Sequence, residues 1–526
     1  MTNEQAEENL FDPERWGLPL EGVETLAEKL YWHWQRFREC FTPRTRDTSR
    51  HAYQYMHGLL TMETGRNFAS KARTLEAQDG QSMQHFMSNS PWSGQAVYER
   101  IQEDICATPQ LGQGSFLILD ESADEKDGLG SAGSGRQYNG RLGKVDTCQV
   151  AVVLGYANWQ SSPWPTWAMV DSELFLPAAW FTPEFTPLRH KLGIPWRRQF
   201  ETKPELGLKM IQRAMERRLP FEAVACDDFY GRDHGFRARL AEMGLFYFAD
   251  VPVATQVYLE RPVVGVPETT ARTGRPKSKR RVLNGVRPIR VDQMGHLEST
   301  AWERLFIRHN ERGLLEDDFA ARRVWTLAKR QFEPREEWLI MRIQRSGKRT
   351  YTLSNAPPDS PVQRLAEGSC GRYFVERLIQ DAKEENGWDE FQAQKYRGWE
   401  HHTALTACAL WFIAQTKLSW AEEYARDPHL LLQLEVEFLP AWSTANVRAM
   451  LKVVLPLPKL SPEEARKQVV NIYHMLLKCD IVKLIKLPAG LPDSSFFHIQ
   501  LPMFCATSHI KARGSSHIEI LISGEV

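Results

Sequence analysis

Apolar residues in the first part of the chain recur three and four positions apart, without the alternation that is typical of strands. This helical spacing is clearest in VETLAEKLYWHWQRF and YQYMHGLLTM, and it extends from Leu18 to about Ile105. Residues 1–108 are therefore predicted to form a helical N-terminal domain.

Short apolar runs replace this pattern between about Gly114 and Pro252. Three strand-like runs come first: SFLILDES, TCQVAVVLGYA and WAMVDSELFLP. Helical and strand-like runs then alternate, in the order PELGLKMIQRAMERR, FEAVACDDF, FRARLAEMG and LFYFADVPV. This order predicts an α/β fold over residues 109–253, in which a mixed sheet carries helices on its faces.

Residues 254–371 interrupt that order with proline, glycine and basic residues. Within them, WLIMRIQ and RTYTLSN flank a short turn at Arg345 to Lys348, which predicts a β-hairpin. We interpret this segment as a β-rich insertion into the α/β core.

Helical spacing returns after the insertion, at 373–386 and across HHTALTACALWFIAQT. Residues 372–420 are therefore predicted to complete the core. Residues 421–526 are predicted to form a helical C-terminal segment, because a Ser-x-x-Glu box at Ser461 opens the run SPEEARKQVVNIYHMLLK. The mixed pattern after Cys479 assigns no element.

Composition narrows the classes of protein that fit this pattern. The chain has 526 residues, 42% of them hydrophobic and 25% charged, as in a soluble protein of roughly two to four domains. Its 66 basic and 66 acidic residues cancel, so affinity for a polyanion must come from local clusters. Eight cysteines without a C-x-x-C pair argue against a structural zinc site and a disulfide framework. These features and the lack of a bilayer-spanning apolar stretch predict a cytoplasmic protein with no membrane partner.

The glycine string that follows the first strand does not fit a nucleotide-binding loop. Such a loop places its glycines immediately after a strand and at the start of a helix. Here seven residues separate Asp120 from Gly128, and the residues that follow are too rich in glycine to propagate a helix. We predict a long connection between two strands.

Two aspartates end apolar strand runs. Asp120 follows FLIL and Asp227 follows FEAVAC. A carboxylate at a strand end lies on the rim of the sheet, where catalytic groups are common in such folds. A lone aspartate there is more often a turn or helix-cap residue, so the two alone do not establish a site.

The helical run RYFVERLIQDAKEENGW supplies a third element. At about 100° per residue, Glu376 lies about 40° and Lys383 about 20° from Arg372, so the three share one stripe. This stripe lies beside the apolar face of the helix, which is formed by Val375, Leu378, Ile379 and Ala382. A solvated helix edge with spaced charges would give the same pattern.

An aspartate on each of two strands, followed by a helix carrying R-x3-E-x6-K, resembles the DDE transposases of bacterial insertion sequences in the insertion sequence 4 superfamily. More closely, the chain resembles the insertion sequence 701 branch, from about Tyr53 to Gln415. The similar blocks are MQHFMSNSPW, LILDES, RQYNGRLGKVDTCQVAVVLGYA, TKPELGLKMIQRA, VACDDFYGRD, GLFYFADV, WLIMRI, LSNAP and VERLIQDAKEENGWDEFQAQKYRGWEHH. The chain departs from the superfamily pattern at Ser369, where that pattern has tyrosine.

The resemblance implies an RNase H-like catalytic core and a DNA-binding role for the N-terminal domain. It places the acidic triad at Asp120, Asp227 and Glu376, with Arg372 and Lys383 as basic companions. The implied activity is metal-dependent cleavage of double-stranded DNA at transposon ends and strand transfer into target DNA, by a homodimer in the synaptic complex. Two alternatives stay open: a domesticated, catalytically silent DNA-binding protein, and an RNase H-like nuclease that does not join its products.

Three converging carboxylates require cations, because two of them about 4 Å apart repel by roughly 4 kcal/mol at an effective dielectric of about 20. Oxygen ligands with open water positions suit Mg²⁺, with Mn²⁺ as a substitute. We therefore expect Asp120, Asp227 and Glu376 to bind two Mg²⁺ ions. We expect Arg372 and Lys383 to contact DNA phosphates near the scissile bond.

Neighbouring residues offer rival assignments. Glu121 and Asp228 are rival metal ligands, ranked lower because consecutive strand residues point to opposite faces. His401 and His402 are adjacent on a helix, about 100° apart, and packing or phosphate contact suits them better than one shared ion. Burial in an apolar strand makes Cys226 a core residue rather than a nucleophile.

Two basic clusters are candidates for holding DNA. The run ARTGRPKSKRR, Ala271 to Arg281, has six basic residues and no acidic one, and is either a solvated linker or a phosphate-binding segment. The DNA-binding candidates in it are Arg275, Lys277, Lys279, Arg280 and Arg281. Contact of all six basic residues with phosphates would give a log–log salt slope of about −5. The second, weaker cluster is Arg36, Arg38, Arg44, Arg46 and Arg50, in the helical domain.

Overall fold

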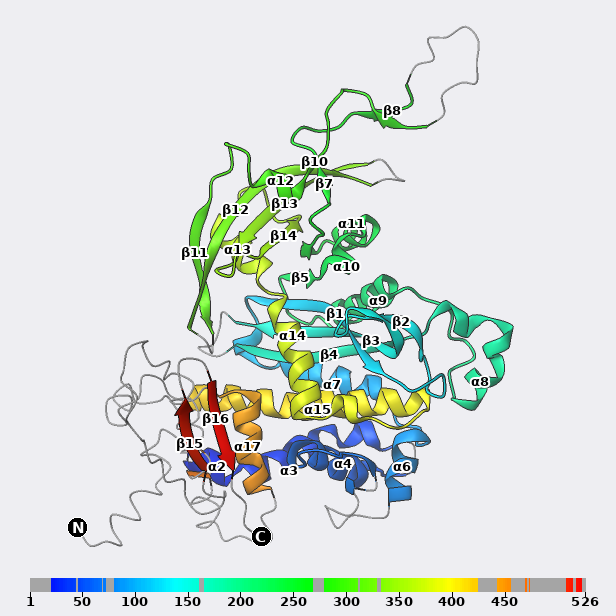
Figure 1. Cartoon of the computed structure of the whole chain (residues 1–526). Coiled ribbons are helices and arrows are strands. Elements are labelled where there is room, and N and C mark those ends of the chain that lie inside the picture. Colours follow the sequence, from blue (N-terminus) through cyan, green and yellow to red (C-terminus); the bar gives the residue numbers. More distant parts are fainter. Residues whose placement is uncertain are drawn as a thin grey trace, which may run out of the picture.

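The computed structural model is a layered α/β protein (Figure 1). The structure describes residues 20–43, 46–68, 70–71, 80–159, 165–267, 279–310, 313–328, 333–423, 442–455, 469–470 and 473, and the backbone of 508–513 and 517–522. Within these ranges, no helix combines the length and the apolar character needed to cross a membrane.

A ten-stranded sheet forms the centre of the described part of the molecule. Its strands are β1 (Ser115–Glu125), β2 (Gly135–Asn139), β3 (Lys144–Asn158), β4 (Thr166–Phe175), β5 (Ala223–Cys226), β6 (Phe246–Asp250), β11 (Glu303–Asn310), β12 (Gly313–Leu327), β13 (Pro334–Ile343) and β14 (Arg349–Ser354). Their order is β11-β12-β13-β14-β6-β5-β1-β3-β2, and β4 pairs with β3. Because β1, β5 and β6 are parallel and the other pairs antiparallel, the predicted mixed sheet is confirmed.

Strand β1 buries both of its faces, because helices cover the sheet on both sides. Leu119 packs against Gly207 of helix α9. A larger residue would not fit at Gly207, because a Cβ atom there would lie 2.4 Å from the Leu119 side chain. Ile118 belongs to a second apolar cluster that includes Phe374 and Val375 of α14. The helices on the two faces are α9 (Lys203–Glu216), α10 (Asp228–Gly231), α11 (His234–Glu242), α13 (Val362–Ser369) and α14 (Tyr373–Gln380).

Two sequence predictions about β1 have different outcomes. The glycine string lies between β1 and β2 and is a strand-to-strand connection, as predicted. The prediction that Asp120 ends the first strand is wrong, because β1 continues to Glu125 by pairing with β3. What stops near Asp120 is the pairing with β5, whose last register partner is Leu119. Asp120 is thus interior to its strand but lies where the neighbouring strand ends.

The segment 254–371 extends the central sheet with strands β11 to β14, and it also forms two small two-stranded sheets. Strand β14 pairs antiparallel with β6, and the hairpin of β13 and β14 is the one predicted from the sequence. Gly347 has φ +82° in its turn, a conformation that favours glycine. The smaller elements of the segment are β7 (Gln256–Val257), β8 (Val264–Gly265), β9 (Arg281–Val282), β10 (Ile289–Arg290) and α12 (Val291–Met294). The two small sheets pair β7 with β10 and β8 with β9.

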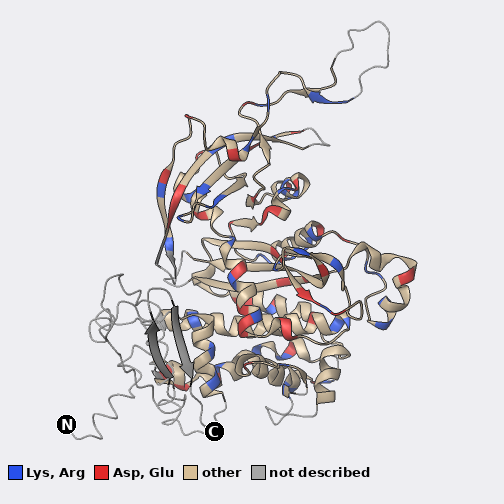
Figure 2. Ribbon diagram, in the orientation of Figure 1, with Lys and Arg blue, Asp and Glu red and all other residues tan. Residues whose placement is uncertain are grey.

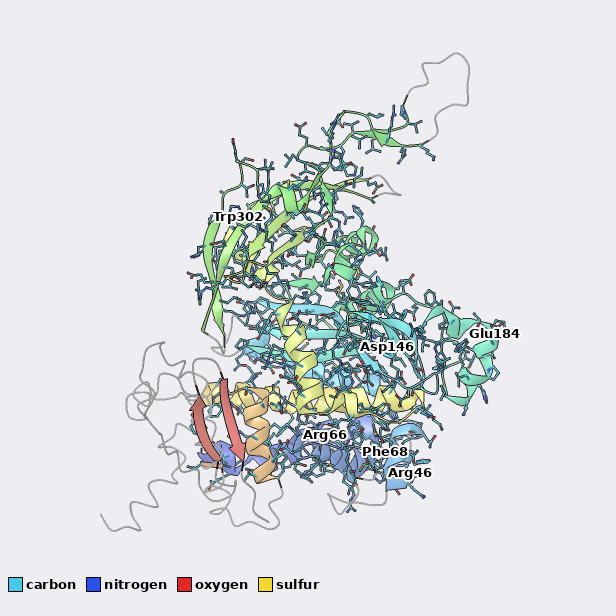
Figure 3. The ribbon with its side chains drawn as sticks, viewed as in Figure 1. Arg46, Arg66, Phe68, Asp146, Glu184 and Trp302 are labelled. Atoms are coloured by element: carbon cyan, nitrogen blue, oxygen red, sulfur yellow. The ribbon has the colours of Figure 1, made fainter. Side chains whose placement is uncertain are left out.

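A helical layer lies beneath the sheet in Figure 1 and is centred on the long helix α15 (Tyr396–Glu423). Helix α15 is apolar around most of its circumference because it packs on β4 from one side and on the N-terminal helices from the other. Those helices are α2 (Leu20–Glu24), α3 (Leu26–Phe37), α4 (Ser49–Thr61), α6 (Gly80–Ser88) and α7 (Gly94–Cys106). Arg66, labelled in Figure 3, joins this layer to the segment before α15 through a 2.5 Å ion pair with Glu390.

Short helical turns complete the connections between these layers. They are η2 (Arg38–Phe41), η3 (Pro109–Leu111), η4 (Ala178–Phe181), η5 (Pro183–Phe185), η6 (Asp381–Glu385) and η7 (Trp388–Glu390), with α8 (Thr186–Lys191) in the protruding loop after β4. Among them, η6 is a π-helical turn that continues α14. The predicted α-helix over 373–386 is therefore wrong beyond Gln380, and so is the 20° angle for Lys383, because a wider turn changes the phase of every later side chain.

The C-terminal part is not wholly helical. Helix α17 (Thr444–Val454) agrees with the helical segment predicted there, but β15 (Ser508–Arg513) and β16 (His517–Ile522) form an antiparallel pair. Most of the helix predicted from Ser461 lies outside the described residues. The stretch after Cys479, to which the sequence pattern assigns no element, therefore includes strands.

Both adjacent histidines of α15 are buried packing residues. Both ring nitrogens of His401 face backbone carbonyls, those of Met87 and Trp92. Nδ1 of His402 lies 2.8 Å from the Tyr55 hydroxyl, and its Nε2 lies 3.0 Å from the Trp388 carbonyl. A neutral His402 ring fits its two partners, because it can donate to the Trp388 carbonyl and accept from the Tyr55 hydroxyl.

Acid is expected to destabilise the protein through His402. Burial lowers the pKa of His402 from 6.5 to about 3, so below pH 6.5 the unfolded chain takes up a proton that the folded chain refuses. Above pH 6.5 the neutral ring of His402 makes its full contribution to the free energy of unfolding. Between pH 6.5 and the folded pKa of about 3, the free energy of unfolding falls by about 1.4 kcal/mol per pH unit. Denaturant titrations between pH 7.5 and 5 should show a shallower loss for His402→Gln than for the unmodified chain. Equal slopes would contradict this prediction.

Candidate functional site

Three aspartates lie side by side where the parallel strands stop pairing. The last register partners are Leu119 with Cys226 and Cys226 with Ala249, and an aspartate follows each of these residues. Asp120, Asp227 and Asp250 therefore form a row across β1, β5 and β6, and neighbouring strands in a sheet are about 4.8 Å apart. Sequence reasoning missed Asp250, although FYFAD carries the same signal as FLILD and AVACD.

Asp227 combines two roles at the end of β5. Its Oδ1 accepts hydrogen bonds from the backbone N–H groups of Phe229 and Tyr230, at 3.1 and 3.3 Å, and so caps helix α10. The cap fixes the direction of the carboxylate. The structural role expected for a lone aspartate is present here, and it uses only one of the two carboxylate oxygens.

Helix α14 brings Glu376 and Arg372 to this row. The buried residues Phe374, Val375 and Leu378 hold the helix against the sheet. Arg372 Nη2 lies 2.6 Å from Glu376 Oε1, one helical turn away. Glu376 itself is half exposed, with 54% of its side chain accessible, so its carboxylate has freedom to move.

Arg372 is shared among three carboxylates. Besides the bond to Glu376, its Nη1 lies 3.4 Å from Asp120 Oδ2 and its Nε lies 3.2 Å from Asp250 Oδ2. These acidic neighbours raise the pKa of the Arg372 guanidinium, against the effect of burial. The arginine thus supplies one positive charge to a site whose other charged groups are carboxyls.

Burial and mutual repulsion make the aspartates reluctant to ionise. Burial, with repulsion from Asp227, raises the pKa of Asp120 to about 7. Burial also raises the pKa of Asp227 to about 6, opposed by its hydrogen bond from Tyr230. Carboxyls in such surroundings gain most from a nearby cation.

The rival acidic residues are engaged elsewhere through at least one oxygen. Glu121 lies on the α9 side of β1, where its Oε1 is 2.8 Å from Lys203 Nζ. Asp228 Oδ1 lies 3.3 Å from Arg232 Nη2 at the surface. Cys226 is buried in β5, and burial raises the pKa of its thiol.

Lys383 lies farther along β1 than the other site residues. Its Nζ donates a 2.9 Å hydrogen bond to the backbone carbonyl of Ala123, three residues beyond Asp120. With Asp124, Trp388 and other residues it lines a small pocket. The structure therefore brings Asp120, Asp227, Glu376 and Arg372 together and places Lys383 beside them along the strand.

The basic candidates for DNA binding lie outside this row. Lys279, Arg280 and Arg281 are exposed on the extension that carries β9, which Figure 2 shows as a basic patch next to the grey trace. Arg275 and Lys277 lie outside the described residues, as does Arg44. In the helical layer, Arg36 is paired with Asp104 and Arg38 with Asp47, whereas Arg46 and Arg50 are exposed. Figure 3 labels Arg46 at the outer side of that layer.

The donor set fits a divalent cation in chemistry, but the side chains are not drawn together around one. Carboxylate oxygens are the ligands that Mg²⁺ and Mn²⁺ prefer. Two buried atoms near the aspartates, Tyr230 Oη and Glu121 Oε2, have no hydrogen-bond partner among the described residues. Nowhere in those residues do three His, Cys, Asp or Glu side chains converge closely enough to hold a metal ion. At this site, the Glu376 carboxylate lies against Arg372 instead.

Comparisons with known proteins identify the family of the chain. Residues 36–314, slightly more than half of the chain, match the family of the DDE superfamily endonucleases. A probable transposase for insertion sequence element IS701, from Microchaete diplosiphon, is 26% identical over 211 residues, which cover 40% of this chain and 50% of that protein. The chain thus spans about half the length of the curated relative that it matches.

Proposed function

The chain belongs to the DDE superfamily endonucleases, enzymes that act on DNA, and from this membership we propose that it is a transposase of an insertion sequence. In this proposal it cuts double-stranded DNA at the ends of its element and joins them to target DNA. The observation that carries the proposal is the row of aspartates at the place where β1, β5 and β6 stop pairing, next to a helix with Arg372 and Glu376. The similarity to a probable insertion-sequence transposase supports it.

The catalytic unit in this proposal is an RNase H-like core. Its support is the mixed sheet, in which parallel β1, β5 and β6 lie next to antiparallel β3 and β2. Helix α14 then brings a residue from far along the chain onto the face that carries Asp120. Strands β11 to β14 would extend this core, and the N-terminal helices would bind the transposon ends. Two copies would act together, since two element ends must be paired and a symmetric dimer suits that task.

The proposed ligands of two Mg²⁺ ions are Asp120, Asp227 and Glu376. The superfamily generally uses divalent metals, and bound metal would activate the attacking oxygen and stabilise the leaving oxygen. For the chain's own residues, Glu376 would leave Arg372 and turn toward the aspartates. Arg372 and Lys383 would then donate to DNA phosphates and hold the scissile bond in place.

A cleavage and joining assay tests the proposal. The full chain is incubated with DNA that carries the sequences flanking its own coding region, a target plasmid, and either Mg²⁺ or EDTA. We expect strand cleavage at the element boundaries and joined products with Mg²⁺ only. Binding without cleavage in Mg²⁺ or Mn²⁺ would identify a catalytically silent DNA-binding protein, and cleavage without joined products would identify a nuclease.

DNA binding is expected to depend on salt through the basic extension. Lys279, Arg280 and Arg281 are exposed, and each phosphate contact adds about 0.9 to the slope of log affinity against log salt. Replacing the three with glutamine should make the slope shallower by about 3 in filter-binding titrations over several salt concentrations. Arg304→Gln is the control, because this arginine is paired with Asp318 on the neighbouring strand. An unchanged slope for the triple variant would assign the run to a linker.

A further inference from the structure

Asp250 differs from the other acidic residues of the site in how firmly it is held. Its Oδ1 accepts a 2.6 Å hydrogen bond from the Thr352 hydroxyl, and its Oδ2 lies 3.2 Å from Arg372 Nε. Thr352 is its register partner on β14, so the donor belongs to the frame of the sheet. Both oxygens of Asp250 therefore have protein partners.

The contacts of Arg372 to the proposed metal ligands are easier to give up. The distance to Asp120 is 3.4 Å, which is long for a charged hydrogen bond, and Glu376 is half exposed. Cations bound at the site would draw both carboxylates away from the guanidinium. Only 29% of the Arg372 side chain is exposed. Its guanidinium would therefore be destabilised if it lost every carboxylate partner.

We propose that Asp250 is a positioning residue that retains Arg372 at the rim of the site while Asp120 and Glu376 turn to cations. This inference rests on the proposed function, because it assumes that those two carboxylates bind metal. Asp250 gives the guanidinium of Arg372 an ion-pair partner that is not one of the proposed metal ligands. It therefore lowers the competition between Arg372 and the cations, and it keeps the two Nη groups near the place where a DNA phosphate would lie.

Mn²⁺ binding to the full chain without DNA tests this role, with the free ion followed by electron paramagnetic resonance. Asp250→Asn keeps an oxygen for the Thr352 hydroxyl but removes the charge that attracts Arg372. We expect about tenfold weaker Mn²⁺ binding, because Arg372 would then stay on Asp120 and Glu376. Arg372→Gln should bind Mn²⁺ more tightly than the unmodified chain, and adding Asp250→Asn to it should change the affinity by no more than about twofold.

Two results would overturn the inference. If Asp250→Asn weakens Mn²⁺ binding equally with and without Arg372, Asp250 acts on the metal directly as a ligand. If Asp250→Asn leaves Mn²⁺ binding unchanged in the presence of Arg372, it positions nothing. Thr352→Val decides the case if Asp250→Asn does not fold, because it removes the hydroxyl at nearly constant volume and should weaken Mn²⁺ binding only while Arg372 is present.

The same titrations separate this inference from the proposed function. Lack of Mn²⁺ binding by the unmodified chain, or full binding by Asp227→Asn, would overturn the proposed function and the inference with it. Weaker binding by Asp227→Asn together with an unchanged affinity for Asp250→Asn would overturn the inference alone.

Discussion

Asp227→Asn is expected to slow DNA cleavage by about a thousandfold or more, because a catalytic metal site supplies several kcal/mol of transition-state stabilisation. The substitution removes one negative charge and keeps the shape of the side chain. Asparagine also caps helices well, so its side-chain oxygen can still accept from the N–H groups of Phe229 and Tyr230. The fold and the affinity for DNA should therefore stay close to those of the unmodified chain.

The matched control for this prediction is Asp228→Asn. Asp228 is the next residue, carries the same charge and pairs with Arg232 at the surface. Rates of strand cleavage in Mg²⁺, thermal melts and DNA-binding titrations should be measured for both variants. A thousandfold loss for Asp228→Asn with normal cleavage by Asp227→Asn would exchange their roles. Normal cleavage by both would reject the proposed ligand set.

The sequence predicts the strands of the core well. Apolar runs such as FLIL and AVAC are typical of strands that are buried on both faces, and this signal is local. It does not predict where β1 ends. The polar residues after Asp120 stay in the strand because β3 continues to pair with them as far as Glu125. That pairing joins residues far apart in sequence, and no local periodicity records it. The pairing of β14 with β6 also joins residues far apart in sequence, so the local pattern does not predict that β14 extends the sheet beyond β6.

The site is predictable from sequence only in part. An aspartate after an apolar strand is a visible signal, but it does not show that three such strands are neighbours, and so Asp250 was missed. The π-helical turn after Gln380 also depends on distant partners. Asp381, in its first position, accepts hydrogen bonds from Trp167 Nε1 at 3.0 Å and from Thr444 Oγ1 at 2.5 Å. Local periodicity does not record these contacts, and the wider turn moves Lys383 out of the phase that a regular helix predicts.

Gly231→Ala is expected to disrupt the fold and the site together, because the backbone of α10 passes directly against the end of β6. A Cβ atom at Gly231 would lie 1.9 Å from the carbonyl oxygen of Asp250 and 2.9 Å from its carbonyl carbon. A flexible side chain could move away from such a clash, but these atoms belong to the backbone of a central strand. Relief therefore requires α10 to shift, and α10 begins at the cap formed by Asp227.

We expect Gly231→Ala to lower the free energy of unfolding by about 3 kcal/mol and the melting temperature by about 3 °C. The rate of DNA cleavage should also fall at temperatures well below the melting temperature, where the protein is still folded. The reason is that Asp227 and Asp250 both border the displaced contact. Gly128→Ala is the control, since a Cβ atom there meets nothing within 4 Å, and it should change stability by less than about 0.5 kcal/mol. Equal melting temperatures for the two variants would show that the crossing of α10 over β6 is looser than the structure describes, and that the aspartate row does not depend on it.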